Sequence, residues 1–296
     1  MIQVDGSRHD WFEGRGEKCV LMGYIDDATS NVFARFYEYE GTYPFMDSFK
    51  RYTRKYGLPH SIYIDKHATY KSTKKPSIED QLENREPLSE VGRALKELSV
   101  EVLYAHSAQA KGRVERLFRT FQDRVIKEMR LKGTKSIKEA NKFLKYYLPV
   151  YNKRFRVEPT RKTDLHRSAP KHINLSSILS VKTERALRND FTVVHNKKLY
   201  QVLTHTISKK VIVEERINGT MFITYKGNPL KYKQIDKRPL KAKPEKLRIS
   251  KPKKLYIPPK DHPYKSFKVS PYTHINSYSQ KEKVGQKEKE LLLTVT

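Results

Sequence analysis

The sequence has very little cysteine, no long apolar run and comparatively few acidic residues. Its one cysteine, Cys19, excludes an internal disulfide framework and is typical of a reducing compartment. The longest apolar runs, such as LLLTV near the C-terminus, are far too short to span a bilayer. No secretory signal peptide precedes Asp5. We therefore expect a soluble, cytoplasmic protein with no membrane partner.

The shortage of acidic residues leaves a large positive charge. The 296 residues contain 33 Asp and Glu against 61 Lys and Arg, a formal net charge of +28, and the pI is near 9.9. Basic surface binds phosphate by releasing counterions, so a nucleic acid is the expected partner. A merely basic soluble or ribosomal protein is the alternative. The length predicts about two domains of roughly 100–200 residues each.

Strand and helix patterns alternate over the first 135 residues. A strand begins with Ile2 and Val4 and is expected to end at Asp5, two more strands follow, and a helix then closes at Gly57, a residue type favoured after helix ends. Next come a strand that ends on Asp65, a helix, another strand and a last helix. The segments after the first are residues 18–27, 32–40, 44–57, 60–65, 89–98 and 100–106, followed by the last helix, whose apolar residues run from Val114 to Met129.

The last of these helices is the best defined. Its apolar residues recur at helical spacing and line one face: Val114, Leu117, Phe118, Phe121, Val125 and Met129. Glu115 lies at the edge of that stripe, and Lys111, Arg119 and Gln122 lie on the same flank as Glu115. A rigid helix is therefore expected to hold a carboxylate among basic and amide groups.

Three acidic residues, Asp5, Asp65 and Glu115, fall on three of these predicted elements. Mg²⁺ prefers oxygen ligands, and two such ions about 3.5–4 Å apart can promote in-line phosphoryl displacement. Each acid also has an ordinary interpretation, because Asp after a strand commonly forms a turn and Glu on an amphipathic helix is usually solvated. The order of the elements and the basic surroundings favour a shared site.

Four segments carry a resemblance to a known family. IQVDGSRHDWFEGRG, YIDDATSNVFARF, IYIDKHATY and HSAQAKGRVERLFRTFQDRVIKEM are similar to the integrase-type catalytic core of bacterial insertion-sequence transposases, most closely those of the ISNCY group. The stretch AKGRVER around Glu115 is the most specific. The resemblance covers residues 1 to about 170.

The resemblance implies a fold and an activity. The fold class is α/β, an RNase H-like core over residues 1–135 in which Asp5, Asp65 and Glu115 form a DDE triad. Two Mg²⁺ or Mn²⁺ ions would be held with Asp5 between them, and the enzyme would cleave DNA and transfer strands without a covalent intermediate. The implied partner is double-stranded DNA, both element ends and target, bound by a homo-oligomer associated with the bacterial nucleoid.

The predicted DNA contacts surround the triad. They are Lys66, His67, Lys111, Arg119 and Gln122, and His67 could equally be a solvated loop residue. Asp10, Asp26 and Asp27 are interpreted as turn residues rather than as members of the triad.

The rest of the chain divides into three parts. Residues 136–185 are predicted to be a helical extension, ended or kinked by Pro149, and a polar linker. Residues 186–236 carry short β-rich runs with turn signals at His195-Asn196, Asn218-Gly219 and Gly227-Asn228, and predict a small barrel. The resemblance implies that this barrel is SH3-like and helps to bind DNA or to organise the assembly; a purely structural cap is the alternative.

Residues 237–296 are expected to form a flexible, basic and proline-rich tail. Residues 237–268 contain twelve Lys or Arg residues but only two acidic residues, Glu245 and Asp261. The six prolines in this segment disfavour helices and strands. Solvated disorder is the alternative to DNA binding for such a charge run.

Three functional classes are consistent with these features. The favoured class is a DDE transposase; the others are a DNA-binding remnant without chemistry and an RNase H-like nuclease that does not transfer strands. Transposases of this type resemble one another in carrying helix-turn-helix modules ahead of the core. We therefore expect sequence-specific recognition of the element ends to need an upstream segment.

The basic tail generates a first prediction. Removing residues from Lys237 onward should flatten the dependence of duplex DNA affinity on salt, by about 0.9 log unit per lost phosphate contact. The measurement is the slope of log affinity against log salt concentration for the full and shortened chains. An unchanged slope would show that the tail makes no phosphate contacts with the duplex.

Overall fold

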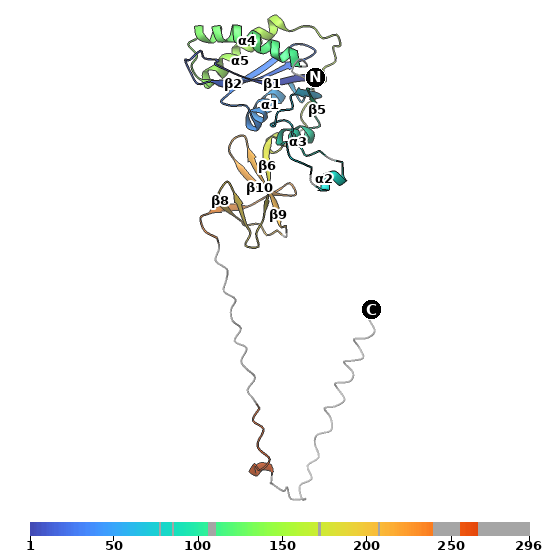
Figure 1. Cartoon of the computed structure of the whole chain (residues 1–296), viewed down its shortest axis with the longest axis vertical. Helices are drawn as coiled ribbons and strands as arrows, with labels where there is room; N and C mark the ends of the chain where they lie inside the picture. Colours follow the sequence, from blue (N-terminus) through green and yellow to red (C-terminus); the bar gives the residue numbers. More distant parts are fainter. Residues whose placement is uncertain are drawn as a thin grey trace. The chain divides into compact units, whose positions relative to one another are not determined.

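A five-stranded mixed sheet organises the N-terminal part of the chain in a computed structural model (Figure 1). The structure describes residues 1–76, 78–84, 86–105, 111–170, 173–206, 208–238 and 255–265. The sheet has the order β3-β2-β1-β4-β5, in which β1, β2 and β3 are antiparallel and β1, β4 and β5 are parallel. Its strands are β1 (Ile2–His9), β2 (Cys19–Asp26), β3 (Val32–Tyr37), β4 (Ser61–Ile64) and β5 (Glu101–Tyr104).

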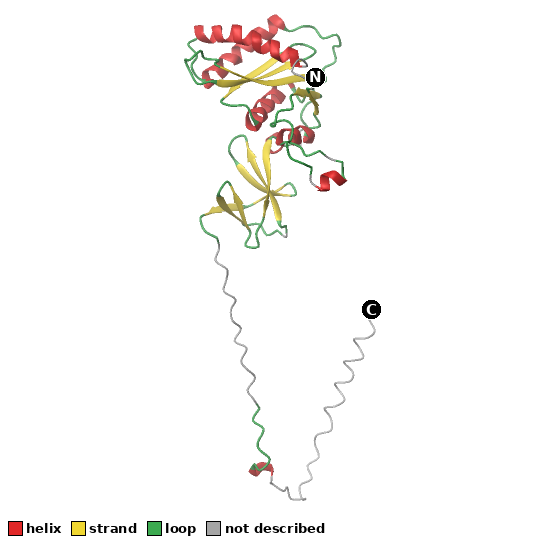
Figure 2. Cartoon of the chain, viewed as in Figure 1, coloured by secondary structure: helices red, strands yellow, loops and turns green. Residues whose placement is uncertain are grey.

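Helices cover both faces of this sheet, as Figure 2 shows. The predicted helices are confirmed, and a short helix α2 that was not predicted precedes α3. Helix α1 ends before Gly57, whose φ of 95° suits a residue without a side chain. The helices of this region are α1 (Thr42–Tyr56), α2 (Ile78–Leu82), α3 (Glu90–Glu97), α4 (Gly112–Leu131) and α5 (Ile137–Phe155).

The alternation of side chains along the strands builds two separate cores. Ile2 and Val4 of β1 point toward α1 and α3, together with residues such as Met22 and Ile62. Side chains on the other face of the sheet, such as Leu21 of β2, pack with α4 and α5. Because successive side chains of a strand alternate between faces, Asp5 belongs to the face that α4 covers.

Strand β1 is longer than the sequence predicts. Asp5 was expected to end it, but the strand continues to His9 and pairs with β2 over its whole length, with Asp5 opposite Gly23. Asp5 therefore lies in the middle of the strand rather than at its end, and its backbone position is fixed by pairing with β2.

Helix α5 protects the exposed edge of the sheet. The side-chain amide of Asn141 donates to the Phe36 carbonyl (3.0 Å) and accepts from the Phe36 amide (2.9 Å). Asn152 makes the same two bonds to Val32, at 2.8 and 2.9 Å. Two asparagines on one face of α5 thus satisfy backbone groups that an edge strand leaves unpaired.

Pro149 was predicted to end or kink this helix. It does not end the helix, because α5 continues to Phe155. Proline denies the helix one backbone hydrogen bond. Pro149 is exposed, so water can solvate the freed carbonyl, and Asn141 and Asn152 tie the helix to β3 on either side.

The C-terminal β region has two small sheets. Their orders are β11-β10-β9-β6 and β12-β8-β7, around buried residues that include Val193, Val213 and Ile223. The predicted turn at Asn218-Gly219 is present, with Gly219 at a φ of 77°. The elements are α6 (Leu175–Ile178), β6 (Ser180–Ala186), β7 (Thr192–His195), β8 (Lys198–Val202), β9 (Lys210–Arg216), β10 (Met221–Tyr225), β11 (Asn228–Leu230) and β12 (Tyr232–Ile235).

Strand β6 corrects the predicted start of the β region, because it begins at Ser180 rather than near residue 186. Its junction with the core depends on Arg93 of α3, which donates to the carbonyl of Ser180 at 2.6 Å. Glu90 accepts from the Lys182 amide at 2.8 Å. The N-terminal core and the β region therefore share polar contacts, and residues 1–240 form one compact unit.

Residues 241–296 form a second unit. Its described part, residues 255–265, holds a short 3-10 helix, η2 (Pro263–Lys265), and most of the predicted basic tail lies outside the described residues. In the described part of the whole chain, no helix combines the length and the hydropathy needed to cross a bilayer.

The edge contact gives a second prediction. Asn141→Ala should lower the free energy of unfolding by about 2 kcal/mol, because the amide and carbonyl of Phe36 lose their partners where α5 restricts water. Chemical denaturation measures this. Lys142→Ala, at the exposed neighbouring position, is the matched control and should change stability by less than about 0.5 kcal/mol. Equal effects of the two substitutions would contradict the role of Asn141.

Candidate active site

The register of two parallel strands brings Asp5 and Asp65 together. Ile2 pairs with Ile62 and Gln3 with Tyr63, an offset of 60 residues. Extending this register by two residues sets Asp65, the residue after β4, beside Asp5 on the neighbouring strand. Neighbouring strands are about 4.8 Å apart, and residues at matching positions face the same side. The two carboxylates therefore project from the same face of the sheet.

The ammonium group of Lys111 contacts both carboxylates. Its Nζ lies 3.0 Å from Asp5 Oδ2 and 3.5 Å from Asp65 Oδ2, and Lys111 is only 7% exposed. Lys111 was predicted to contact DNA, and the structure places its side chain in these ion pairs. Lys111 immediately precedes α4, so the start of this helix sets where the ammonium lies.

Burial and charge act on these groups in opposite directions. Burial raises the pKa of Asp5 above its ordinary value, and the Lys111 ammonium only partly offsets this. For Lys111, burial alone lowers the pKa, but the carboxylates of Asp5 and Asp65 outweigh it and the net pKa is raised. Lys111 is therefore held in its charged form between the two acids.

Helix α4 lies along β1 on the face that carries Asp5. The Val114 amide donates to Gln3 Oε1 at 3.3 Å, and Gln122 Nε2 donates to Ser7 Oγ at 3.4 Å. These two contacts flank Asp5 on β1. Gln122, which was predicted to contact DNA, therefore has a partner within the protein.

A glycine allows this close approach. A β-carbon on Gly23, the partner of Asp5 on β2, would lie 2.8 Å from the Phe118 ring. The buried face of α4 also holds all six of the predicted apolar residues. Glu115, in the first turn of α4, is partly exposed next to Val114, at the end of the helix that is bound to Gln3.

Glu40 is a fourth carboxylate near Asp5, and the sequence interpretation missed it. Tyr70, which is fully buried, donates its hydroxyl to Glu40 Oε1 at 3.1 Å, and a β-carbon on Gly6 would overlap the Glu40 carboxylate. Burial raises the pKa of Glu40, and the nearby charges of Asp5 and Asp65 add to this. The local sequence pattern does not predict that Glu40 lies near Asp5. Glu40 follows β3, which is two strands away from β1 in the sheet.

The other predicted residues lie around this group. His67 is exposed, and its amide donates to Asp65 Oδ1 at 2.9 Å while its ring contacts Thr69. Lys66 and Arg119 are also exposed. The three acids interpreted as turn residues are confirmed: Asp10 accepts from Gly14, Asp26 accepts from Thr29, and Asp27 follows β2 and pairs with Arg113 of α4.

The donor set can be compared with the needs of a divalent cation. Asp5 and Asp65 supply hard oxygen atoms that already converge on one cationic group, which fits Mg²⁺ or Mn²⁺. Within the described ranges, no three His, Cys, Asp or Glu side chains are gathered closely enough to enclose a metal ion. Two carboxylates are therefore brought together, and Glu115 stands on the adjoining helix.

Two curated proteins named as transposases align with the chain. The chain is 34% identical over 246 residues to y4bF of Sinorhizobium fredii, a protein named as a transposase, and this alignment covers 80% of the chain and 52% of that protein. It is 25% identical over 296 residues to the transposase for insertion sequence IS1202 of Streptococcus pneumoniae, covering 95% of the chain and 61% of that protein.

The chain is homologous to proteins named as transposases, one of them for an insertion sequence, and it spans about half to three fifths of their length. No protein-family model matches it.

Solved structures that align with the chain are retroviral integrases. The catalytic core of the integrase of BIV aligns at 14% identity and a TM-score of 0.31, over 48% of this chain and 77% of that one. The HTLV-2 integrase core in complex with magnesium aligns at 15% identity and a TM-score of 0.34, over 48% and 78%. A simian T-cell lymphotropic virus intasome aligns at 13% identity and a TM-score of 0.37, over 80% and 79%.

The ion pairs of Lys111 give a third prediction. In buffer without divalent ions, Lys111→Met should lower the free energy of unfolding by about 2 kcal/mol, because two partly buried carboxylates lose their counter-charge. Mg²⁺ or Mn²⁺ should then raise the melting temperature of this variant more than that of the wild type, since no internal ammonium competes with the ion. Thermal denaturation across a metal titration measures both effects.

Lys127→Met is the control, because Lys127 forms an exposed ion pair with Asp123 on the same helix. It should change stability by less than about 1 kcal/mol and leave the metal response unchanged. Equal metal-induced shifts in Lys111→Met and the wild type would contradict competition at Asp5 and Asp65.

Proposed function

We propose that this protein is a DDE transposase, an enzyme that cleaves DNA at the ends of a mobile element and joins the cut strand to target DNA. The observation that carries the proposal is the convergence of Asp5 and Asp65 on the Lys111 ammonium, beside a helix that carries Glu115 in its first turn. Homology to named transposases supports the same reaction class.

In this proposal Asp5, Asp65 and Glu115 hold two Mg²⁺ or Mn²⁺ ions. When bound, the metal supplies charge stabilisation to the phosphate and lowers the cost of ionising the attacking hydroxyl. Asp5 would contribute a fixed oxygen donor because its position on β1 is paired with Gly23 of β2. Asp65 follows a short buried strand and accepts from the His67 amide, which orients its carboxylate.

Residues around the acids would position the DNA. Lys66, His67 and Arg119 are exposed beside the site and suited to contact phosphate oxygens. Once metal offsets the charge of Asp5 and Asp65, Lys111 is free to contact the phosphate, which reconciles its ion pairs with a role in DNA binding. Gln122, bonded to Ser7, would hold α4 in place beside β1, and its second amide hydrogen could donate to a phosphate oxygen.

The remaining parts of the chain would bind the rest of the substrate. The β region of about residues 186–236 would act as an SH3-like barrel, with residues 1–135 as the RNase H-like core, 136–185 as its extension and 237–296 as a basic tail. Two element ends and a target must be held together, so we propose a homo-oligomer on double-stranded DNA.

The proposal is tested by substituting the triad, which is the fourth prediction. Asp5→Ala, Asp65→Ala and Glu115→Ala should each remove most DNA cleavage and strand transfer, because each acid holds a metal ion. Affinity for duplex DNA should stay equal or increase, since a negative charge near the phosphate is lost. The measurement is a strand-transfer assay with Mn²⁺ and a DNA donor that has a free 3′-hydroxyl, together with binding at fixed salt.

Asp123→Ala is the matched control, because Asp123 is an exposed acid on α4 whose ion pair is with Lys127. It should leave both activities unchanged. Full activity in any of the three triad variants would move the catalytic site elsewhere. Cleavage without joined product in the wild type would instead identify a nuclease, and DNA binding without either reaction would identify a binding protein.

A further inference from the structure

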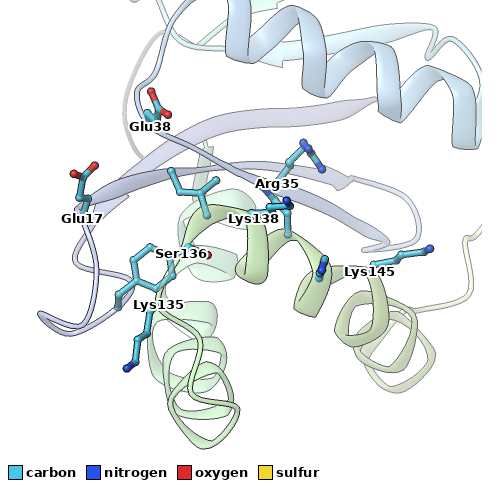
Figure 3. Close-up of a pocket in the computed structure, with 11 residues that line it drawn as sticks. Glu17, Arg35, Glu38, Lys135, Ser136, Lys138 and Lys145 are labelled. Atoms are coloured by element: carbon cyan, nitrogen blue, oxygen red, sulfur yellow. The ribbon is translucent and has the colours of Figure 1, made fainter.

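A basic groove follows the junction between β3 and α5. Its larger part is a hollow of about 720 Å³, drawn in Figure 3, which also borders the loop after β1. Five cationic side chains line this hollow against two acids, Glu17 and Glu38. The cationic residues are Arg35, Lys135, Lys138, Lys142 and Lys145.

The groove continues toward α1. A second hollow of about 470 Å³ shares Arg35, Asn141 and Lys145 with the first and adds two further basic residues, Arg51 and Lys55. Positive side chains from three elements, β3, α5 and α1, therefore lie along one continuous path. We call this path the β3–α5 groove.

The floor of the groove is fixed. Phe12 is 1% exposed, and Asn141 bonds both backbone groups of Phe36. The distance between β3 and α5 is therefore held by backbone-directed hydrogen bonds rather than by flexible surface side chains. Such a frame presents the lysines at a defined spacing.

The lysines of α5 carry uncompensated charge. Lys138, Lys142 and Lys145 are exposed and, among the described residues, none of them forms an ion pair. Other exposed cations on the neighbouring helix are paired, such as Arg113 with Asp27 at 2.9 Å. Like charges three and four residues apart destabilise a helix by about 0.2–0.5 kcal/mol per pair. This arrangement costs stability, and an anionic ligand would offset that cost.

The spacing of these lysines fits a polymer of phosphates. Seven residues separate Lys138 from Lys145, which is about 10 Å along the helix axis. One strand of duplex DNA advances about 3.4 Å per phosphate, so the row spans about three phosphates. A single small anion would occupy only part of such a path.

We propose that the β3–α5 groove binds the sugar-phosphate backbone of duplex DNA, at a place separate from the carboxylates. Strand β3 lies two positions from β1 in the sheet, about 10 Å away, and the groove is on its outer edge. This inference rests on the proposed function, because it adds a second DNA contact to the same enzyme. The groove holds DNA in place and takes no part in the chemistry.

The first test, our fifth prediction, removes charge while keeping helix-forming residues. Lys138→Gln, Lys142→Gln and Lys145→Gln combined should reduce the slope of log affinity against log salt by about two to three units, near 0.9 per lost phosphate contact. The control combines Lys127→Gln of α4, Lys132→Gln just after α4 and Lys153→Gln of α5, three lysines that do not line the groove. It should change the slope by less than about one unit.

The second test locates the DNA directly and uses the chain's own cysteine content. Cys19 is fully buried, and burial raises the pKa of its thiol to about 12, so it will not react. Lys142→Cys therefore introduces the one reactive thiol, which should exchange with a duplex that carries a mixed-disulfide tether on its backbone, forming a protein–DNA disulfide and releasing the tether's small thiol. Lys153→Cys is the matched control and should cross-link much less.

The outcomes separate the groove from the proposed function. If the wild type shows no salt-dependent binding to duplex DNA, the proposed function itself fails. If the wild type binds but both charge variants have equal slopes, or both cysteines cross-link equally, the groove is overturned and the transposase proposal stands. Displacement of the duplex by poly-glutamate of equal charge would also contradict the groove proposal, because the groove would then bind any polyanion rather than the DNA backbone.

Discussion

Two carboxylates on adjacent parallel strands repel each other, and the folded chain depends on the Lys111 ammonium to offset that repulsion. The strand register places Asp5 and Asp65 side by side, and the start of α4 brings Lys111 between them. Helix α4 is in turn held against β1 by Gln3 and Ser7. The sheet register, the position of α4 and the site are therefore one connected arrangement.

This arrangement also explains why the neighbouring residues are small or polar. Gly23 leaves room for Phe118, and without that space α4 could not lie close to β1. Gly6 leaves room for the Glu40 carboxylate, which Tyr70 fixes from the other side. Close packing by glycine and hydrogen bonding by buried tyrosine together bring four charged groups to one place.

Much of this could be predicted from local patterns. The apolar stripe of α4 is periodic enough to define the helix, and the 60-residue spacing of Asp5 and Asp65 equals the offset of the strand register. Glu40 and the partners of Lys111 could not be predicted, because they depend on which strands become neighbours. The same limit applies to Pro149, whose usual effect is overcome by contacts from Asn141 and Asn152.

The asparagine contacts on β3 have a consequence for how this sheet can grow. An unpaired edge strand is a template on which a strand from another chain can add, and that is a common route to aggregation. Asn141 and Asn152 occupy the outward-facing amides and carbonyls of Phe36 and Val32, so a foreign strand could add there only if α5 first detached. The opposite edge is β5, a strand of four residues. At the β3 edge, the five-stranded sheet is thus closed to extension by another strand as long as α5 stays in place.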